Sequence, residues 1–180
     1  MNIEIKRVLP ANAALLNELS RITFADTFAA TCTPEDLQDF LQINYNLPLL
    51  QQELEDEKNL YFIAWADDVP AGYILMKEDY SSLPVMQQWK AIELKRIYVL
   101  KDYHGKGLAQ LMMDFIIDYA KEYGYEAVWL GVWEHNGRAR KFYSKYGFEY
   151  SGLSHDFPIG STPQTDVWLW KFLKEGAKKM

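Results

Sequence analysis

Two glycines flanking a single lysine, Gly105-Lys106-Gly107, interrupt a stretch of chain that is apolar on both sides. A surface turn between a strand and a helix needs one glycine at most. Glycine lacks a Cβ atom, so two of them here would let another group approach the backbone closely. The predicted helix that follows, residues 105–123, offers free N–H groups and the positive end of its dipole at the same place. The segment is therefore typical of a binding site for an anion such as a phosphate.

The glycine pair fits neither of two common nucleotide-binding motifs. A P-loop places Lys and then Ser or Thr after its second glycine, whereas Leu108 follows Gly107. The dinucleotide fingerprint G-x-G-x-x-G needs a third glycine where Gln110 stands. Glu134 could mimic the ribose-binding acid of that fold, but too little chain follows it to complete a doubly wound sheet. A tight turn with a solvated Lys106 remains as the alternative to a phosphate site.

Length and composition predict one globular domain over residues 1–180. The chain is 49% hydrophobic and rich in aromatic residues, which excludes a disordered protein. The net charge of −6 argues against nucleic acid as a partner and suits a cationic substrate. The single cysteine, Cys32, cannot form an internal disulfide and fits a reducing compartment. With no secretory signal and no apolar run long enough to span a membrane, we expect a cytoplasmic protein.

Hydrophobic periodicity predicts an α/β or α+β fold, in which helices flank a mixed, mostly antiparallel sheet. Strands are expected at residues 3–7, 60–66, 71–77, 91–100, 127–133, 148–155 and 165–172. Helices are expected at residues 11–30, 48–57, 105–123 and 136–147, and a further helix is expected to begin at Pro34. The first helix is expected to face the core with Ala14, Leu15, Leu19, Ile22 and Phe28.

Local signals set several of these boundaries. Thr33 followed by Pro34 is typical of a helix start, with Thr as the N-cap. Asp67 and Asp68 supply a hairpin turn between two apolar runs. Gly124 ends the long helix in the left-handed conformation that glycine adopts at little cost.

Two sequence blocks carry a resemblance to a known family. His104, Gly105, Lys106, Gly107, Leu108 and Ala109 occupy a pyrophosphate-binding motif, Q/R-x-x-G-x-G/A, with His104 in place of the usual Gln or Arg. A second block, N-x-x-A-x-x-F-Y-x-K-x-G-F, is met by Asn136, Ala139, Phe142, Tyr143, Lys145, Gly147 and Phe148. In this order and at this separation, the blocks resemble those of the GNAT (Gcn5-related) N-acetyltransferases. The order of predicted elements extends the resemblance over essentially the whole chain.

The resemblance implies the GNAT fold and acetyl-CoA as co-substrate, without a metal. The acyl carrier is expected across splayed strands at Ile97 and Val128. The residues expected to bind it are Ile97, Tyr98, Val99, His104, Gly105, Lys106, Gly107, Leu108, Ala109, Gln110, Asn136, Phe142 and Lys145.

The resemblance also implies two catalytic candidates. Tyr143 matches the tyrosine that protonates the departing thiolate, although it could equally be a core aromatic residue. Glu93 aligns with the position where some members carry a base. Strand alternation predicts that Glu93 faces the same side as Lys95 and Ile97, where it could also be a plain surface carboxylate. His155 or a chain of water molecules could take the role of base instead.

A closer similarity concerns the acceptor. The segments ITFADTF, LKRIYV, LGVWEHN and QTD resemble those of bacterial PaiA-type polyamine N-acetyltransferases, which acetylate spermidine and spermine. A groove for a small cationic amine would need carboxylates and aromatic faces. The candidates are Asp26, Glu35, Asp36, Tyr80, Trp89 and His155, and the acids among them could also be ordinary solvated charges. A protein- or peptide-modifying acetyltransferase and a non-catalytic CoA sensor remain alternatives, and the sequence leaves the oligomeric state open, a homodimer included.

Overall fold

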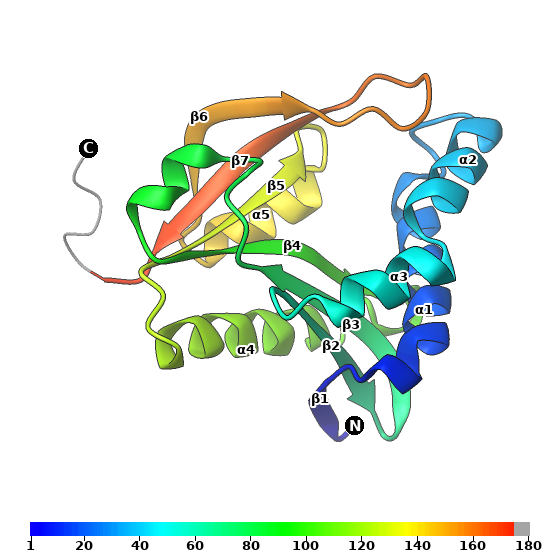
Figure 1. The fold of residues 1–180 in the computed structure, drawn as a ribbon, viewed down its shortest axis with the longest axis horizontal. Helices are drawn as coiled ribbons and strands as arrows, with labels where there is room; N and C mark the ends of the chain where they lie inside the picture. Colours follow the sequence, from blue (N-terminus) through cyan, green and yellow to red (C-terminus); the bar gives the residue numbers. More distant parts are fainter. Residues whose placement is uncertain (175–180) are drawn as a thin grey trace.

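A seven-stranded mixed sheet forms the centre of the computed structural model, which describes residues 1–174 (Figure 1). The strand order is β1-β2-β3-β4-β5-β7-β6, and all neighbouring pairs are antiparallel except β4 and β5. The strands are β1 (Ile3–Arg7), β2 (Asn59–Ala66), β3 (Val69–Lys77), β4 (Ala91–Val99), β5 (Ala127–Trp133), β6 (Glu149–Asp156) and β7 (Thr165–Phe172). The predicted mixed, mostly antiparallel sheet is confirmed.

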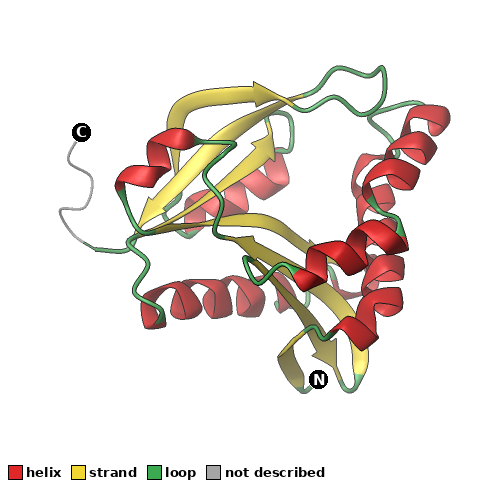
Figure 2. Cartoon of the chain, viewed as in Figure 1, coloured by secondary structure: helices red, strands yellow, loops and turns green. Residues whose placement is uncertain are grey.

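Helices cover both faces of this sheet (Figure 2). They are α1 (Ala13–Phe28), α2 (Pro34–Asn44), α3 (Leu47–Glu55), α4 (Leu108–Glu122) and α5 (Gly137–Lys145), with short 3-10 helices at Pro10–Asn12, Pro84–Gln88 and Lys101–Tyr103. One face packs against α4 and α5 through residues such as Met112, Ile116 and Tyr143. The other face packs against α1 and α3, and α2 lies against α1 through the stacked rings of Phe24 and Phe40. Within residues 1–174, no helix combines the length and apolar character that crossing a bilayer would require.

The predicted boundary signals are confirmed by the local geometry. The Thr33 side chain accepts a hydrogen bond from the backbone N–H of Asp36 at 3.1 Å and so caps α2. Asp67 and Asp68 both have positive φ, at 48° and 65°, in the turn between β2 and β3. Gly124 follows α4 with a φ of 73°. Each of these residues therefore adopts the capping or turn conformation that its residue type favours.

Helix α1 buries only part of the predicted stripe. Leu19 and Phe28 are buried and Leu15 is partly buried, as predicted, but Ala14 and Ile22 are exposed. Leu16 and Phe24, which were not predicted, are almost completely buried. The predicted stripe considered only apolar residues, but the buried face also contains small polar ones. The hydroxyl of Thr23, for example, is buried and donates to a carbonyl one turn earlier in the helix at 2.8 Å. Such a bond lets a threonine occupy a core position without an unsatisfied polar atom.

A β-bulge in β4 reverses which residues face which side of the sheet. Leu94 pairs with Met76 and Arg96 with Leu75, so Lys95 has no direct partner on β3. Leu94 and Ile97, three residues apart, consequently pack in the same cluster against α4. An unbroken strand would place them on opposite faces.

Candidate active site

A cavity of about 760 Å³ opens where β4 and β5 separate. The two strands pair only between Ala91–Glu93 and Ala127–Trp129, and beyond that point β4 continues along β3 alone. At one end the cavity reaches the glycine segment before α4, and at the other it reaches α1 and the β6–β7 hairpin. The two strands are therefore splayed at Ile97, as expected, whereas Val128 pairs with Ile92 and does not line the cavity.

The lining of this cavity includes most of the predicted site residues. Of the residues expected to bind the acyl carrier, it contains Ile97, Tyr98, Val99, His104, Gly105, Gly107, Leu108, Ala109, Gln110, Asn136 and Phe142, but neither Lys106 nor Lys145. Of the expected catalytic and acceptor residues, it contains Glu93, Tyr143, Asp26 and His155, but neither Glu35 nor Tyr80.

The glycine segment adopts a backbone that favours glycine at two positions. Gly105 and Gly107 have φ values of 76° and 85°, and α4 begins at Leu108, three residues later than predicted. A Cβ atom built on either glycine would meet no atom of residues 1–174 within 4 Å outside its chain neighbours. The first N–H groups of α4, including those of Ala109 and Gln110, have no partner within the helix. Open space beside bare Cα atoms and free N–H groups fits a pyrophosphate held by the backbone.

His104 is fixed between a carbonyl and an arginine that the sequence reasoning missed. Its Nε2 lies 2.9 Å from the carbonyl oxygen of Val99, and its Nδ1 lies 3.3 Å from Nη1 of Arg138. If Nε2 donates to the carbonyl, Nδ1 accepts from the guanidinium, which is the pattern of a neutral imidazole. Arg138, at the start of α5, thus brings a positive charge beside the position where the motif usually has Gln or Arg.

Glu93 lies on the opposite face of the sheet from the one predicted. Because of the bulge, it shares the α1 side with Arg96 and Tyr98, while Ile97 packs toward α4. It is only 3% exposed, so it is not a surface carboxylate. Burial raises its pKa, an effect that the ammonium of Lys95, 3.2 Å away, opposes. A buried carboxylate with a raised pKa in a cavity is suited to proton transfer.

Tyr143 presents a buried phenol to the same cavity. It is 8% exposed, and its ring packs edge-on against those of Phe142 and Phe148. Burial, with a further contribution from the negative charge of Asp166, raises its pKa. The hydroxyl therefore keeps its proton at neutral pH and can donate it. Asn136 positions the start of this helix by accepting a hydrogen bond from the backbone N–H of Ala139 at 3.0 Å.

A carboxylate predicted to contact the acceptor instead holds the β6–β7 loop in place. Asp36 accepts hydrogen bonds from the backbone N–H and hydroxyl of Ser161, at 2.7 and 3.1 Å, and from the hydroxyl of Thr162 at 2.9 Å. These bonds, chiefly that from the Ser161 N–H, lower the pKa of its carboxyl group. A Cβ atom on Gly160 would lie 2.1 Å from Asp36, so the loop needs glycine there. Figure 1 shows this loop reaching the N-terminal end of α2.

The remaining acceptor candidates have mixed positions. Asp26 lies at the cavity but is paired with Lys101 at 2.7 Å. Tyr80 donates its hydroxyl to the backbone oxygen of Ala91 at 2.9 Å and so fixes the start of β4. Trp89 packs edge-on against a phenylalanine of β7. What the sequence did not predict is an aromatic wall of the cavity, made by Phe24, Phe28, Tyr45, Trp133 and Phe157.

His155 stacks on Trp168 where the cavity reaches the β6–β7 hairpin, with ring centroids 4.2 Å apart. Its pKa is lowered, first by burial and then by the positive charge of Lys95. Next to it on β7 lies Asp166, a cavity residue for which the sequence reasoning gave no role. The signal was present: alternation along 165–172 places Asp166 on the same face as Trp168, a polar group at the start of a buried apolar strand.

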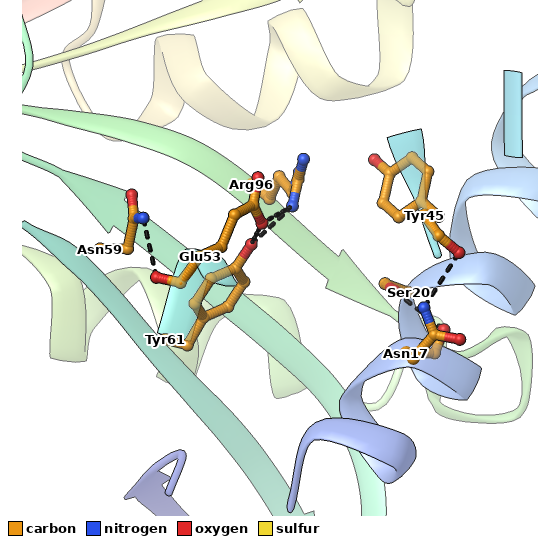
Figure 3. A network of polar contacts seen from close by, with 7 residues as sticks. All are labelled: Asn17, Ser20, Tyr45, Glu53, Asn59, Tyr61 and Arg96. Carbon is orange, nitrogen blue, oxygen red and sulfur yellow. Dashed lines mark hydrogen bonds and ion pairs between the residues drawn. The ribbon is translucent and has the colours of Figure 1, made fainter. Parts of the chain in front are cut away.

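Arg96 is a cationic lining residue whose charge is already compensated (Figure 3). It donates to the hydroxyl of Tyr61 at 2.7 Å and lies 3.5 Å from the carboxylate of Glu53, to which Tyr61 also donates. Its guanidinium lies 4.8 Å from the ring centroid of Tyr45. The network joins β4 to α3 and to the C-terminal end of α2, so it fixes the wall of the cavity and compensates the charge of Arg96.

Replacing Gly107 by Val is expected to lower acetyl-CoA affinity at least tenfold, about 1.4 kcal/mol, because the branched side chain would fill the space above the free N–H groups. Isothermal titration calorimetry measures this directly. Gly152→Val is the matched control, since Gly152 has the same φ of 85°, has equally open surroundings and lies outside the cavity lining. It carries the same backbone strain, so equal affinity in both variants would contradict the assignment.

The sequence is similar to known N-acetyltransferases. A family model described as "Acetyltransferase (GNAT) family" matches residues 18–148. An uncharacterised N-acetyltransferase encoded in the pepI 3′ region of Lactobacillus delbrueckii subsp. lactis is 33% identical over 155 residues, which is 86% of this chain and 88% of that protein. The spermine/spermidine N(1)-acetyltransferase of Bacillus subtilis is 32% identical over 60 residues only, 33% of this chain and 40% of the relative.

Among solved structures, the fold is similar to that of the PaiA N-acetyltransferase from Thermoplasma acidophilum, which was crystallised with coenzyme A. The TM-score is 0.76 at 22% sequence identity, over 96% of this chain and 99% of the other. At that identity the similarity establishes the fold and not the acceptor.

Proposed function

Because this chain belongs to the GNAT family of acetyltransferases, we propose that the amine to which it transfers the acetyl group of acetyl-CoA is a polyamine. Membership of the family identifies the protein as an acetyl-CoA-dependent N-acetyltransferase. The proposal concerns the identity of the amine acceptor. The short match to a spermine/spermidine N(1)-acetyltransferase supports the same class of acceptor.

The observation that carries the proposal is the contrast between the two ends of one cavity. At the α4 end, bare glycines and free N–H groups suit a pyrophosphate. At the other end, the buried Glu93, the partly buried Asp166 and the aromatic wall suit an organic cation. An amine that enters between the two ends of the cavity meets the carboxylate of Glu93 on β4 and the phenol of Tyr143 on α5.

The reaction needs proton transfers from the amine and to the thiolate, together with the exchange of a carbon–sulfur bond for a nitrogen–carbon bond, and these residues can support them. The acceptor is protonated at neutral pH, since aliphatic amines have a pKa near 10. Glu93 accepts a proton from the acceptor, directly or through water, so that the free nitrogen can attack the acetyl carbon. The nitrogen–carbon bond forms, the carbon–sulfur bond breaks, and Tyr143 supplies the proton that the coenzyme A thiolate takes up. The second proton lost from the nitrogen restores Tyr143 or leaves to solvent.

A thiol-release assay with DTNB tests the acceptor. Spermidine and spermine are compared with an N-acetylated peptide that contains one lysine and with a peptide that has a free N-terminus. We expect kcat/KM for spermidine to exceed that for either peptide at least tenfold at low ionic strength. The advantage should shrink as salt rises, because screening at 0.15 M reduces the attraction of exposed charges beyond about 8 Å.

The rival functions correspond to other outcomes of the same assay. Faster acetylation of either peptide, with no effect of salt, would identify a protein- or peptide-modifying enzyme. Binding of acetyl-CoA without thiol release from any amine would identify a coenzyme A sensor.

A further inference from the structure

Side chains from β6 and β7 crowd against Gly131 on β5, where this glycine lines the cavity. A Cβ atom at this glycine would lie 2.9 Å from the Trp168 ring, 3.3 Å from Oδ2 of Asp166 and 3.4 Å from Cε1 of His155. Three side chains from β6 and β7 therefore converge on one point, and only the absence of a side chain on β5 leaves room for them. The convergence is built by the strand register, which pairs His155 with Asp166 and Gly131 with Trp168.

The charged side chains around Gly131 carry more negative than positive charge. Lys95 pairs with Glu93 at 3.2 Å, and its positive charge also reaches Asp166 and His155. Oδ1 of Asp166 is buried and has no hydrogen-bond partner among residues 1–174. Burial raises the pKa of Asp166 to about 6, so it is mostly ionised at neutral pH. Two carboxylates thus share one ammonium group, and one negative charge is left over.

The other cationic side chains of the lining do not supply the missing charge. Arg96 is compensated by Glu53. Arg138 lies at the other end, beside His104 and the glycine segment. His155 favours its neutral form, because burial and Lys95 both lower its pKa. The surplus negative charge at Asp166 is therefore a feature that a cationic ligand can neutralise.

We propose that Asp166 binds a second ammonium group of the acceptor, the one that is not acetylated, and so makes the enzyme selective for diamines and polyamines over monoamines. The inference rests on the proposed polyamine acceptor and names the residue that would recognise it. The reacting nitrogen must lose its charge before it attacks, so a lasting ion pair can form only with another nitrogen. The edge of the Trp168 ring lies beside the same point, and His155 stacks on the face of that ring.

Matched amines isolate the second charge. 1,4-Diaminobutane and n-butylamine share a four-carbon chain and differ in whether the far end carries an ammonium group. We expect the wild-type protein to show at least a tenfold higher kcat/KM for the diamine. Asp166→Asn should reduce this ratio at least tenfold, because kcat/KM falls much more for the diamine than for n-butylamine. Loss of structure alone would lower both values together.

Asp156→Asn is the control, because Asp156 is exposed on β6, next to His155, and lies outside the cavity lining. It removes the same charge from the same hairpin and should leave the ratio unchanged. Asp166→Glu, which keeps the charge, should retain part of the preference. If Asp166→Asn does not fold, Asp166→Glu and a fall of the wild-type ratio with rising salt serve as the test.

The role of Asp166 and the polyamine acceptor fail through different results. An unchanged ratio in a folded Asp166→Asn variant would overturn the role of Asp166 while the polyamine acceptor stands. A wild-type ratio near one would overturn the polyamine acceptor itself, and the role of Asp166 with it.

Discussion

Replacing Tyr143 by Phe is expected to lower kcat about 10²–10⁴-fold, the contribution that general acid catalysis typically makes, with little change in KM for acetyl-CoA. The substitution removes only a hydroxyl. The ring keeps its packing against Phe142 and Phe148, so the fold should survive. Burial raises the pKa of this phenol, which keeps the proton available for the thiolate. Steady-state kinetics at saturating acetyl-CoA measure the effect.

Tyr146→Phe is the matched control from the same segment. The Tyr146 hydroxyl donates to the backbone oxygen of Gln110 and to the carboxylate of Asp114, and the side chain does not line the cavity. Its loss should lower stability slightly and leave kcat near the wild-type value. A Tyr143→Phe enzyme with kcat within twofold of wild type would make Tyr143 a packing residue only.

Replacing Glu93 by Gln is expected to lower kcat/KM for the amine about 100-fold at pH 7.5, because the cavity loses the carboxylate that accepts the proton. Glutamine has nearly the same size, so the buried position stays filled. Lys95, 41% exposed, can turn to solvent when its partner becomes neutral. The deficit should narrow toward pH 9.5, where more of the amine is already deprotonated in solution. A purely structural role would not produce that recovery.

The control for this prediction is Glu78→Gln, which removes a carboxylate charge outside the cavity lining, where Glu78 accepts a hydrogen bond from the Tyr125 hydroxyl. It should leave the pH–rate profile unchanged. If the Glu93→Gln enzyme stays within threefold of wild type from pH 7 to 9.5, then water or His155 removes the proton.

Most of the fold could be predicted because its boundaries depend on local chemistry. Thr33, Asp67 and Gly124 act within one turn of the chain, and the apolar runs of β2 and β3 are long enough to identify as strands. The stripe of α1 could not be predicted in the same way. Which side of a helix is buried depends on where the sheet lies, and small residues such as Thr23 can satisfy their hydroxyls inside the helix.

The site was most predictable where the sequence contains a contiguous motif, although Asp26, Glu93 and His155, which lie outside such motifs, also line the cavity as predicted. The glycine segment and the residues around Asn136 lie within short blocks, so their place in the cavity followed from the resemblance. The acceptor end is assembled instead from β4, β5 and the β6–β7 hairpin, which meet only through tertiary pairing. Asp36 holds the β6–β7 loop through a hydrogen bond with Ser161, which is 125 residues away in the sequence. Hydrophobic periodicity gives no information about a contact between such distant residues.

The bulge at Lys95 makes β4 a strand with two phases. Before it, odd-numbered residues such as Glu93 face α1, and after it even-numbered residues such as Arg96 and Tyr98 do so. In the proposed reaction the two parts of this strand have different roles: Glu93, before the bulge, faces the amine, and the edge after it, which diverges from β5, holds the thioester. Any substitution or graft along this strand must be counted from Lys95, since a parity rule applied to its whole length assigns the residues on one side of the bulge to the wrong face of the sheet.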